Sequence, residues 1–251
     1  MSKNLKEIIR NRTPVVGCFV TIPHPASVEA CAVEGIDFVC LDAEHGTIGR
    51  EAMENMLRAA DCRQMPTLVR VPDAKSSWIG WALDAGAQGI VVPRVETVAD
   101  ARSVVDAAYY SPRGQRGVGP GRASSYGTNL RAAVSDAHER TSVVVQIETF
   151  EGVTNAADIV RVPGIDAVFI GPIDLSQSLL SVPEADRPSL DEAIAAVQKA
   201  CSAAGCTMGI FRVDYSDRKK WSDFPLLIVG TDVMFMQGGI RAAQAAQDTS
   251  L

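Results

Sequence analysis

Four segments of the chain repeat one pattern: a helix-forming stretch with small apolar residues, a glycine, and then a run rich in β-branched residues. The copies are AVEGIDFVCLD (32–42), ALDAGAQGIVVP (82–93), VRVPGIDAVFIGP (160–172) and SAAGCTMGIF (202–211). In each copy the glycine suits the end of a helix, followed by a short turn into a buried strand. Because a chain that alternates helix and strand in this way builds a parallel sheet, the pattern predicts an α/β fold.

The intervals between these copies supply further strands, giving eight in all, the number that closes a TIM barrel. The strands are expected at Val15–Thr21, Asp37–Leu41, Thr67–Val71, Gly89–Pro93, Val143–Ile147, Ala167–Ile170, Met208–Arg212 and Val233–Met236. The helices are expected near Pro25–Glu34, Glu51–Cys62, Ser76–Asp84, Val98–Ala107, Asn129–Glu139, Val153–Val160 and Leu190–Ala203. The segment FPLLIVG (224–230) also has the composition of a strand, and we assign it to the end of a helix.

The length of 251 residues suits a single (β/α)8 TIM-barrel domain that spans residues 1–251. Hydrophobic residues make up 47% of the chain and aromatic residues only 6%, so the core is expected to be large and aliphatic. A doubly wound sheet is the alternative fold. That fold usually carries G-x-G-x-x-G after its first strand, and here the first strand runs into Thr21–Pro25 instead.

Composition narrows the partners to small molecules. The net charge of −6 and the lack of a basic run in the sequence argue against nucleic acid, whose phosphates need a positive surface. The sequence has no apolar run of about 18 residues for a membrane span and no charged-then-apolar leader, so the cytoplasm is the expected location. Its six cysteines lie in apolar contexts without a C-x-x-C pair, which predicts buried, reduced thiols.

Two acids mark the ends of neighbouring strands within residues 143–176. Glu148 follows the strand Val143–Ile147, and Asp174 follows the strand Ala167–Ile170. Buried parallel strands tolerate a charge at their ends when it has a partner, and ligands bind at that edge, so the two acids suggest a divalent cation. The alternative is that Glu148 is a solvated loop acid and Asp174 the N-cap of a short helix.

The other strand ends add polar groups to the same edge of the predicted barrel. These ends read LDAEH (41–45), VR (69–70), PR (93–94), QIE (146–148), GPID (171–174) and FR (211–212). Asp42 precedes His45 by three residues, close enough for its carboxylate to orient the imidazole as a base. The remaining histidines, His24 and His138, are interpreted as structural.

Schiff-base chemistry is not expected, because no lysine falls on a predicted strand of the barrel. The lysines are Lys3, Lys6, Lys75, Lys199, Lys219 and Lys220. A metal Lewis acid remains: an ion on Glu148 and Asp174 could chelate a 2-oxo acid, with Arg70 stabilising an enolate and His45 moving a proton. Carboxylate and water ligands favour Mg²⁺ or Mn²⁺, and they also admit Co²⁺ or Zn²⁺.

Over nearly its whole length the chain resembles the class II pyruvate aldolases of the HpcH/HpaI family, which includes 4-hydroxy-2-oxoheptane-1,7-dioate and 2-dehydro-3-deoxygalactarate aldolases. The resemblance rests on the ordered series LDAEH (41–45), LVR (68–70), ALDAGAQGIVVP (82–93), YYSPRGQRGVG (109–119), VQIET (145–149) and VFIGPIDLS (168–176). It implies reversible, metal-dependent cleavage of a 4-hydroxy-2-oxo acid to pyruvate and an aldehyde. The residues to which it assigns catalysis or metal binding are Asp42, His45, Arg70, Asp84, Glu148 and Asp174.

The same resemblance implies how pyruvate is held. Gln146 is expected beside the substrate, and the backbone N–H groups of Ile173 and Asp174 are expected to meet the pyruvate carboxylate. Gly171 and Pro172 leave room for that approach, since position 171 carries no side chain.

An assembly is implied as well, because family members are homo-hexamers built as trimers of dimers. Their final helix packs on a neighbouring subunit, which also helps to close the active site. Asp84 matches an acid that a neighbour supplies toward the histidine, and RGVGPGR (116–122) matches a segment near the distal end of the substrate. For that loop a flexible surface turn is the alternative.

The aldehyde half of the substrate is where the sequence departs from the family. Phe19 stands where many relatives carry tryptophan, and the segment after strand seven, FRVDYSDRKKW (211–221), is more charged than expected. Phe19, Phe211 and Arg212 are therefore candidates for contacts with this half. Arg212 could instead pair with an acid in the loop, Asp214 or Asp217.

Two other functions stay open. A related enolate lyase would act on a CoA thioester or on oxaloacetate, but the sequence has no basic, aromatic-lined segment for an adenine nucleotide. A non-catalytic barrel that binds 2-oxo acids would need neither His45 nor Arg70.

Overall fold

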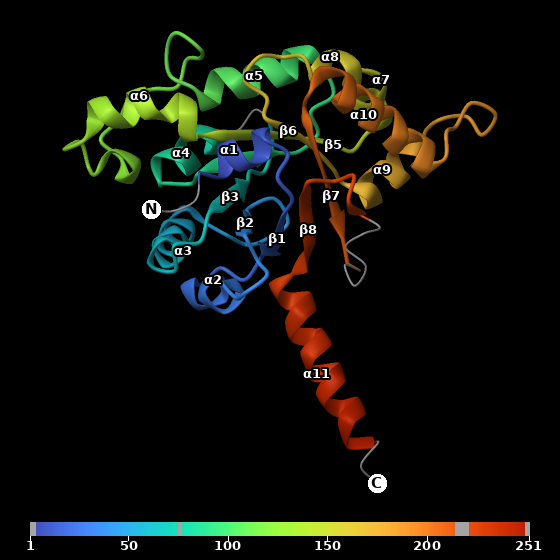
Figure 1. Ribbon diagram of the computed structural model, residues 1–251, viewed down its shortest axis with the longest axis horizontal. Coiled ribbons are helices and arrows are strands. Elements are labelled where there is room, and N and C mark those ends of the chain that lie inside the picture. The colour runs from blue at the N-terminus through green and yellow to red at the C-terminus, as the bar shows by residue number, and fades with distance from the viewer. Residues whose placement is uncertain (1–3, 75–76, 214–220, 249–251) are drawn as a thin grey trace.

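In a computed structural model, eight parallel strands form a closed barrel in chain order, with β1 paired to both β2 and β8 (Figure 1). The structure describes residues 4–74, 77–213 and 221–248. The strands are β1 (Val15–Val20), β2 (Phe38–Asp42), β3 (Thr67–Arg70), β4 (Gly89–Val92), β5 (Ser142–Ile147), β6 (Ala167–Ile170), β7 (Thr207–Arg212) and β8 (Leu226–Thr231). The prediction of a single (β/α)8 barrel is confirmed.

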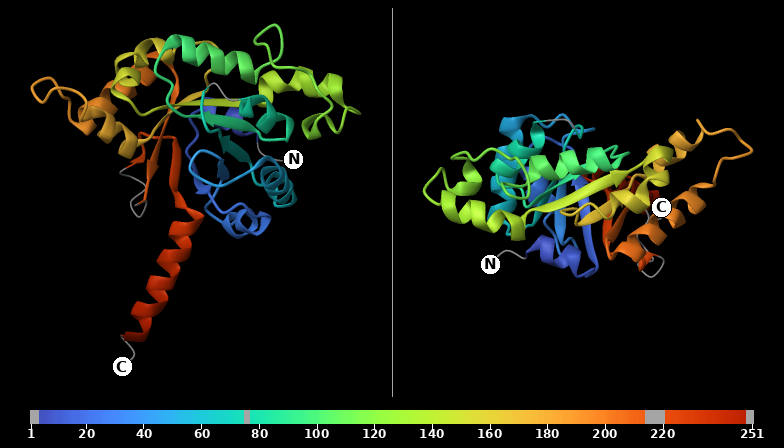
Figure 2. Two further views of the ribbon diagram at one scale, coloured as in Figure 1. Left: turned by 180° about the vertical axis from the view of Figure 1, so that it is seen from behind. Right: turned by 90° about the horizontal axis from the view of Figure 1, so that it is seen from above.

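Helices α2 to α10 lie between successive strands and cover the outside of the barrel, while α1 precedes the first strand and α11 follows the last (Figure 2). They are α1 (Leu5–Arg10), α2 (Pro25–Cys31), α3 (Arg50–Cys62), α4 (Trp78–Asp84), α5 (Val98–Ala108), α6 (Leu130–Arg140), α7 (Phe150–Thr154), α8 (Ala156–Ile159), α9 (Pro172–Leu179), α10 (Leu190–Ala204) and α11 (Asp232–Asp248). The helix expected over Val153–Val160 is divided between α7 and α8. Ser76, the expected first residue of α4, lies outside the described residues.

The prediction for strand eight is wrong. Residues 233–236 lie in the first turn and a half of helix α11. The FPLLIVG segment contains most of β8, which pairs with β1 and β7. Leu226 and Ile228, alternate residues of β8, are buried in the barrel interior, as a closing strand requires. Asp232 then starts the helix, where its carboxylate accepts hydrogen bonds from the N–H groups of Thr21 and Ile22.

The amino end of the barrel is closed by α1. Leu5 and Ile9 each have 1% of their surface exposed and pack against the interior side chains of the strands. Lys6 is equally buried, and its Nζ donates to Tyr109 Oη at 2.6 Å, to the carbonyl of Thr141 at 2.6 Å and to Asp166 at 3.2 Å. This lysine therefore has a structural partner set at the end of the barrel opposite the strand carboxyl ends.

Strand register brings the polar residues of the site to one edge. Asp42 is paired with Arg70 across β2 and β3, and Gln146 is paired with Phe169 across β5 and β6. Because side chains alternate across a strand, the residues two positions earlier, Cys40 and Leu68, fill the barrel interior beneath Asp42 and Arg70. The polar side chains therefore form the uppermost layer of the interior, at the strand carboxyl ends.

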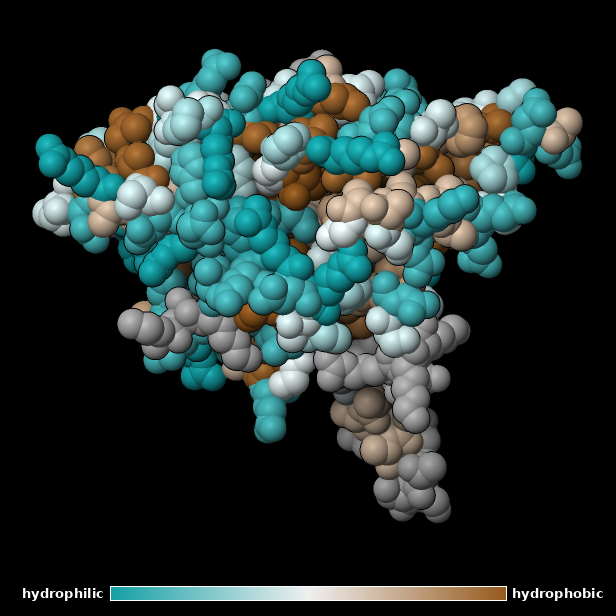
Figure 3. Space-filling model, turned by 45° about the horizontal axis from the view of Figure 1, so that its top comes forward, coloured by the Kyte–Doolittle hydropathy of each residue, from teal (hydrophilic) through white to brown (hydrophobic). Residues whose placement is uncertain are grey.

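Helix α11 projects away from the barrel (Figures 1 and 2). Its described side chains include exposed apolar residues, and the coloured atoms of this projection are partly tan to brown in Figure 3, whereas most of the barrel surface in that view is hydrophilic. The exposed apolar residues are Val233, Met234, Phe235, Met236 and Ile240. Across the described ranges, no helix combines the length and apolar character that a membrane span requires.

Candidate active site

A bidentate ion pair between Arg70 and Asp42 joins the ends of β2 and β3. Arg70 Nε donates to Asp42 Oδ1 at 2.9 Å, and its terminal Nη2 donates to Asp42 Oδ2 at 2.7 Å. Both side chains are nearly buried, and the guanidinium Cζ lies 4.2 Å from the centre of the Phe19 ring. The pair fixes the plane of the guanidinium at the mouth of the barrel, because a bidentate contact leaves it little rotational freedom.

Glu44 is a site residue that the sequence analysis missed. Its side chain is 15% exposed, and Oε2 lies 3.3 Å from Arg70 Nε. Burial, together with the negative charges of Asp42 and Asp174, raises the pKa of Glu44 to about 7 despite the opposing effect of Arg70. The LDAEH segment could have indicated it, because Glu44 stands there between Asp42 and His45, the two residues predicted to act in catalysis.

The predicted side-chain dyad of Asp42 and His45 is not formed in the single chain. Within the described residues, Asp42 reaches His45 through the backbone, where the His45 N–H donates to Oδ1 at 3.2 Å. Arg70 engages both carboxylate oxygens of Asp42, and no hydrogen bond joins either oxygen to the ring among the described residues. The His45 side chain is 60% exposed, and its Nε2 lies 3.9 Å from Glu44 Oε2.

Glu148 is a buried acid rather than the solvated one that was the alternative. Only 4% of its surface is exposed, Oε1 accepts the Arg94 N–H at 2.9 Å, and Oε2 accepts a short hydrogen bond from Gln146 Nε2. Burial, followed by repulsion from Glu44 and Asp174, raises the pKa of Glu148 to about 7. Glu44 and Asp174 are therefore close enough to Glu148 to destabilise its charged form.

Asp174 lies inside the first turn of α9 and does not cap it, since Gly171 holds the N-cap position and Pro172 begins the helix. The N–H groups of Ile173 and Asp174 consequently have no carbonyl one turn earlier within the helix. A Cβ on Gly171 would lie 2.8 Å from Gln146 Nε2 and 2.8 Å from Glu148 Oε2. Glycine at this position therefore keeps α9 close to Glu148.

The carboxylates of Glu148 and Asp174 fit a hard divalent cation. The raised pKa of Glu148 reflects burial first and then the negative charges of Glu44 and Asp174, while Arg70 is paired with Asp42. A divalent ion would relieve this repulsion, and carboxylate oxygens are the ligands that Mg²⁺ and Mn²⁺ prefer. In the part of the chain that the structure describes, no three His, Cys, Asp or Glu side chains form a metal-binding group, so two residues would have to suffice.

The side chains expected to contact the aldehyde lie in two different places. Phe19 is 3% exposed and packs beneath Arg70, with its ring 5.8 Å from that of Phe211. Arg212 follows Phe211 on the strand and so points to the other side of β7, where its Cζ lies 4.3 Å from the centre of the Trp221 ring. No contact of the described residues joins Arg212 to the site, and Asp214 and Asp217 lie outside those residues.

Asp84 ends α4 and lies on the opposite side of the barrel from His45, because α4 leads into the amino end of β4. In the single chain it forms a short ion pair with Arg116, which belongs to the 116–122 loop. Gly121 of that loop also packs closely, since its Cβ would lie 3.0 Å from the Asp84 carbonyl oxygen. Asp84 could therefore meet a His45 side chain only of another chain.

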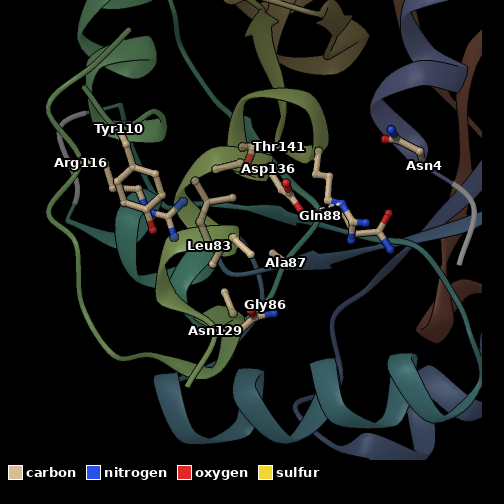
Figure 4. A pocket seen from close by; sticks show the side chains of 15 residues that line it. Asn4, Leu83, Gly86, Ala87, Gln88, Tyr110, Arg116, Asn129, Asp136 and Thr141 are labelled. Carbon is tan, nitrogen blue, oxygen red and sulfur yellow. Dashed lines mark ion pairs between the residues drawn. The ribbon is translucent and has the colours of Figure 1, made fainter. Parts of the chain in front are cut away.

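A cavity of about 590 Å³ lies next to this ion pair (Figure 4). Its lining includes Gln88 and Thr141, which precede β4 and β5, so it opens at the amino ends of the strands. In TIM barrels the chemistry lies at the carboxyl ends. The cavity is consequently separate from the cluster around Arg70 and Glu148.

Other nucleophiles lie away from this cluster. Lys6 is held at the amino end of the barrel, and Lys199 belongs to α10, while the remaining lysines lie outside the described residues. All six cysteines are free thiols, and five are buried as expected. Cys62 is exposed at the end of α3, which corrects that expectation for one residue. The fold and these strand-end groups together define a TIM-barrel enzyme with an acid-rich site and one fixed arginine.

Comparisons with known proteins identify the family. Residues 15–224 match the family model described as HpcH/HpaI aldolase/citrate lyase. The chain is 33% identical to a hydroxypyruvate/pyruvate aldolase of Delftia acidovorans (98% of this chain, 95% of that one) and 36% identical to a 4-hydroxy-2-oxovalerate aldolase of Rhodococcus jostii (96% and 95%). The chain therefore belongs to the HpcH/HpaI aldolase/citrate lyase family and is an aldolase, a carbon–carbon lyase.

Solved structures agree with this assignment. An HpcH/HpaI family protein from Burkholderia cenocepacia has a TM-score of 0.89 at 32% identity, covering 99% of this chain and all 100% of that one. The citrate synthase SbnG has a TM-score of 0.86 at 30% identity, with 98% of each chain covered. A citrate lyase β subunit of Mycobacterium tuberculosis, described with oxaloacetate and magnesium, is 16% identical with a TM-score of 0.58 and so shares the fold alone.

Replacing Gly171 with alanine should weaken Mn²⁺ binding on the order of 10- to 100-fold, the usual effect of disturbing the groups that support metal ligands. The added Cβ would displace Glu148 Oε2, which lies 2.8 Å from its position. Binding is measured by electron paramagnetic resonance of free Mn²⁺. Gly80→Ala is the matched control, because its Cβ would enter open space. Unchanged affinity in Gly171→Ala would contradict the assignment of Glu148 as a ligand.

Proposed function

We propose that residues 1–251 act as one metal-dependent aldolase that reversibly cleaves a 4-hydroxy-2-oxo acid to pyruvate, or a close 2-oxo acid, and an aldehyde. The observation that carries the proposal is the meeting of a fixed guanidinium, Arg70, with two acids, the buried Glu148 and the exposed Asp174, at one end of the barrel. Arg70 would stabilise an enolate, and Glu148 and Asp174 would bind a cation. The related aldolases of Delftia acidovorans and Rhodococcus jostii support the reaction class.

The 2-oxo acid would lie between Arg70 and the first turn of α9. The N–H groups of Ile173 and Asp174 are suited to its carboxylate, because anions bind at helix N-termini. Arg70 would stabilise the negative charge that develops on the C2 oxygen when the C3–C4 bond breaks. Gln146 would add a contact, since its Oε1 is buried and has no hydrogen-bond partner among the described residues.

His45 would take the proton from the C4 hydroxyl group as the aldehyde leaves. The exposed ring reaches the rim of the barrel, where the aldehyde half of the substrate would lie. An imidazole is suited to this transfer near neutral pH because its ordinary pKa is about 6.5.

Glu148 and Asp174 would hold a divalent cation, with Mg²⁺ or Mn²⁺ favoured and Co²⁺ or Zn²⁺ also compatible with oxygen ligands. When bound, such an ion supplies Lewis-acid polarisation of the 2-oxo group. Its binding requires both carboxylates in their charged forms. Because the pKa of Glu148 is raised to about 7, protons should compete with the ion below that pH.

A second reaction on the same site is supported by the likeness to the citrate synthase SbnG. An enolate site of this kind could act on oxaloacetate or on a thioester in place of a 4-hydroxy-2-oxo acid. The substrates differ at C4, which carries a hydroxyl group in a 4-hydroxy-2-oxo acid and is a carboxylate in oxaloacetate. A panel of substrates therefore separates the two functions.

The test is pyruvate release from a panel of 4-hydroxy-2-oxo acids, with oxaloacetate and CoA thioesters as controls, before and after treatment with EDTA. We expect release from at least one 4-hydroxy-2-oxo acid, loss after chelation, and recovery with Mg²⁺ or Mn²⁺. Release that survives chelation, or an adduct trapped by borohydride, would contradict metal-dependent cleavage. Activity on CoA thioesters alone would favour the second reaction.

Substitutions of Arg70 and of His45 should affect aldol cleavage and oxaloacetate decarboxylation differently. Arg70→Ala should lose both aldol cleavage and oxaloacetate decarboxylation, because both pass through the same enolate. His45→Ala should lose cleavage by about 10²–10⁴-fold, the contribution of a general base, and retain more of the decarboxylation. Mn²⁺ binding serves as the control for an intact site. Equal loss of both reactions in both variants would refute this division.

We also infer that the enzyme is a homo-oligomer, with a trimer of dimers as the expected assembly. Helix α11 projects from the barrel and exposes Phe235, Met236 and Ile240, so an isolated chain would leave a large apolar face in water (Figure 1). At its base lies a cavity of about 410 Å³ with Cys31, Val33 and Met236 in its lining, which could receive apolar side chains of a second copy.

Changing Met236 and Ile240 together to glutamate should shift the chain toward the monomer, because the charges would be buried in the assembly. The mass in solution is measured by light scattering coupled to size-exclusion chromatography. Gln244→Glu is the matched control, since it adds a charge to an exposed polar position of the same helix. A wild-type monomer, or a double variant with the mass of the wild type, would refute packing through this face.

Small-molecule partners and a cytoplasmic location complete the proposal. All six cysteines are free, which suits a reducing compartment. The net charge of −6 disfavours binding to nucleic acid.

A further inference from the structure

Glu44 lies among the side chains of the proposed site without a role in the reaction described above. Its carboxylate lies between Arg70 and His45, with Oε2 3.3 Å from Arg70 Nε and 3.9 Å from His45 Nε2. Oε2 is buried and has no hydrogen-bond partner among the described residues. A buried acceptor of this kind normally has a donor, and the imidazole of His45, 3.9 Å away, is one that could approach it.

The two other acids considered for His45 are each engaged with an arginine in the single chain. Asp42 uses both oxygens for Arg70, and Oδ1 also accepts the backbone N–H groups of Glu44 and His45. Asp84 lies at the opposite end of the barrel and is paired with Arg116. Among the described residues, Glu44 Oε2 is the carboxylate oxygen that lies near the ring without accepting a hydrogen bond, although it also forms an ion pair with Arg70 at 3.3 Å.

We propose that Glu44 is the positioning residue for His45, accepting a hydrogen bond from Nε2 and leaving Nδ1 to take the proton from the substrate. This assignment rests on the proposed function, because it concerns the proton that aldol cleavage releases. The 3.9 Å separation must shorten to about 3 Å, which the ring can achieve because its side chain is 60% exposed and not packed in place.

The proton balance of the step is simple. The O–H bond of the C4 hydroxyl breaks as the N–H bond forms at Nδ1, and the electrons of the C3–C4 bond pass to the enolate. The imidazolium that results is stabilised by the adjacent carboxylate of Glu44, in the same way that an acid supports a catalytic histidine in other enzymes. In the reverse reaction Nδ1 returns the proton to the new alkoxide.

Several charged groups set the state of Glu44. Arg70 and Arg94 favour the carboxylate, whereas burial and the charges of Asp42 and Asp174 favour the protonated acid, and Glu148 is repelled by Glu44 in turn. The pKa of Glu44 is raised to about 7, close to the ordinary imidazole value of about 6.5. If Glu44 holds the ring, the two groups are coupled, and the proposal then requires that the ring does not follow a single-proton curve.

The first test is the titration of His45 followed by nuclear magnetic resonance of the metal-free protein labelled at histidine. The chain has three histidines, so His24 and His138 serve as internal references. We expect a broad, two-step curve for His45 in the wild type and a single-proton curve in Glu44→Gln. A single-proton curve for the wild type would overturn the proposal without any variant.

Asp84→Asn and Asp42→Asn are the competing variants. Asp84→Asn should leave the His45 curve unchanged, whereas a change there and none in Glu44→Gln would assign the ring to a neighbouring subunit. Asp42→Asn should preserve the two-step form, because its effect on the ring passes through Arg70. Loss of the two-step form in Asp42→Asn with its retention in Glu44→Gln would restore the dyad predicted from the sequence.

The second test is kinetic. Glu44→Gln should lower kcat for cleavage on the order of 10- to 100-fold, part of the 10²–10⁴-fold that a general base contributes, with KM and Mn²⁺ affinity little changed. Decarboxylation of oxaloacetate should fall less. A cleavage rate within a few fold of the wild type would overturn the proposal. If the wild type cleaves no 4-hydroxy-2-oxo acid, the proposed function fails, and the titration still decides whether Glu44 holds the ring.

Discussion

The ion pair between Arg70 and Asp42 is the constraint on which the rest of the site depends. It fixes the guanidinium through two hydrogen bonds of 2.9 and 2.7 Å, and it pairs the charge of Arg70 with that of Asp42. Burial, together with the charges of neighbouring acids, raises the pKa of Glu44 and of Glu148, although Arg70 still favours the charged form of Glu44. A cation at Glu148 and Asp174 would balance these negative charges, and a proton on Glu44 would do so in its absence.

The barrel could be predicted from the sequence because its repeated unit is local. A helix, a glycine turn and a β-branched strand follow one another within about a dozen residues, and each copy specifies one unit of the sheet. The acids Glu148 and Asp174 were predicted at this edge for the same reason, since Glu148 directly follows β5 and Asp174 lies in the first turn of the helix after β6. Strand β8 was misplaced because residues 226–231 and 233–236 are both apolar, and only the need of the barrel interior for Leu226 and Ile228 distinguishes them.

The parts of the site that the sequence did not predict depend on the direction in which side chains point, not on their position along the chain. Spacing placed Asp42 near His45, but the parity of β2 turns Asp42 toward Arg70 on the next strand. Because side chains alternate along a strand, Arg212 points to the opposite side of β7 from Phe211. It therefore does not face the barrel interior, although its neighbour in the sequence does. Glu44 was missed because its burial arises from packing across β2 and β3, which no local pattern expresses.

The two ends of the barrel show how polar satisfaction separates a structural cluster from a functional one. At the amino end, Asp166 is buried, yet its two oxygens are engaged by Lys6, Arg10 and the N–H of Val143. At the carboxyl end, Glu44 Oε2 and Gln146 Oε1 are equally sheltered and have no hydrogen-bond partner among the described residues. A buried oxygen without a donor destabilises the fold unless a ligand or a moving side chain supplies one. The closed network around Asp166 therefore stabilises the amino end of the barrel, and the unpaired oxygens of Glu44 and Gln146 are acceptors that a ligand would need.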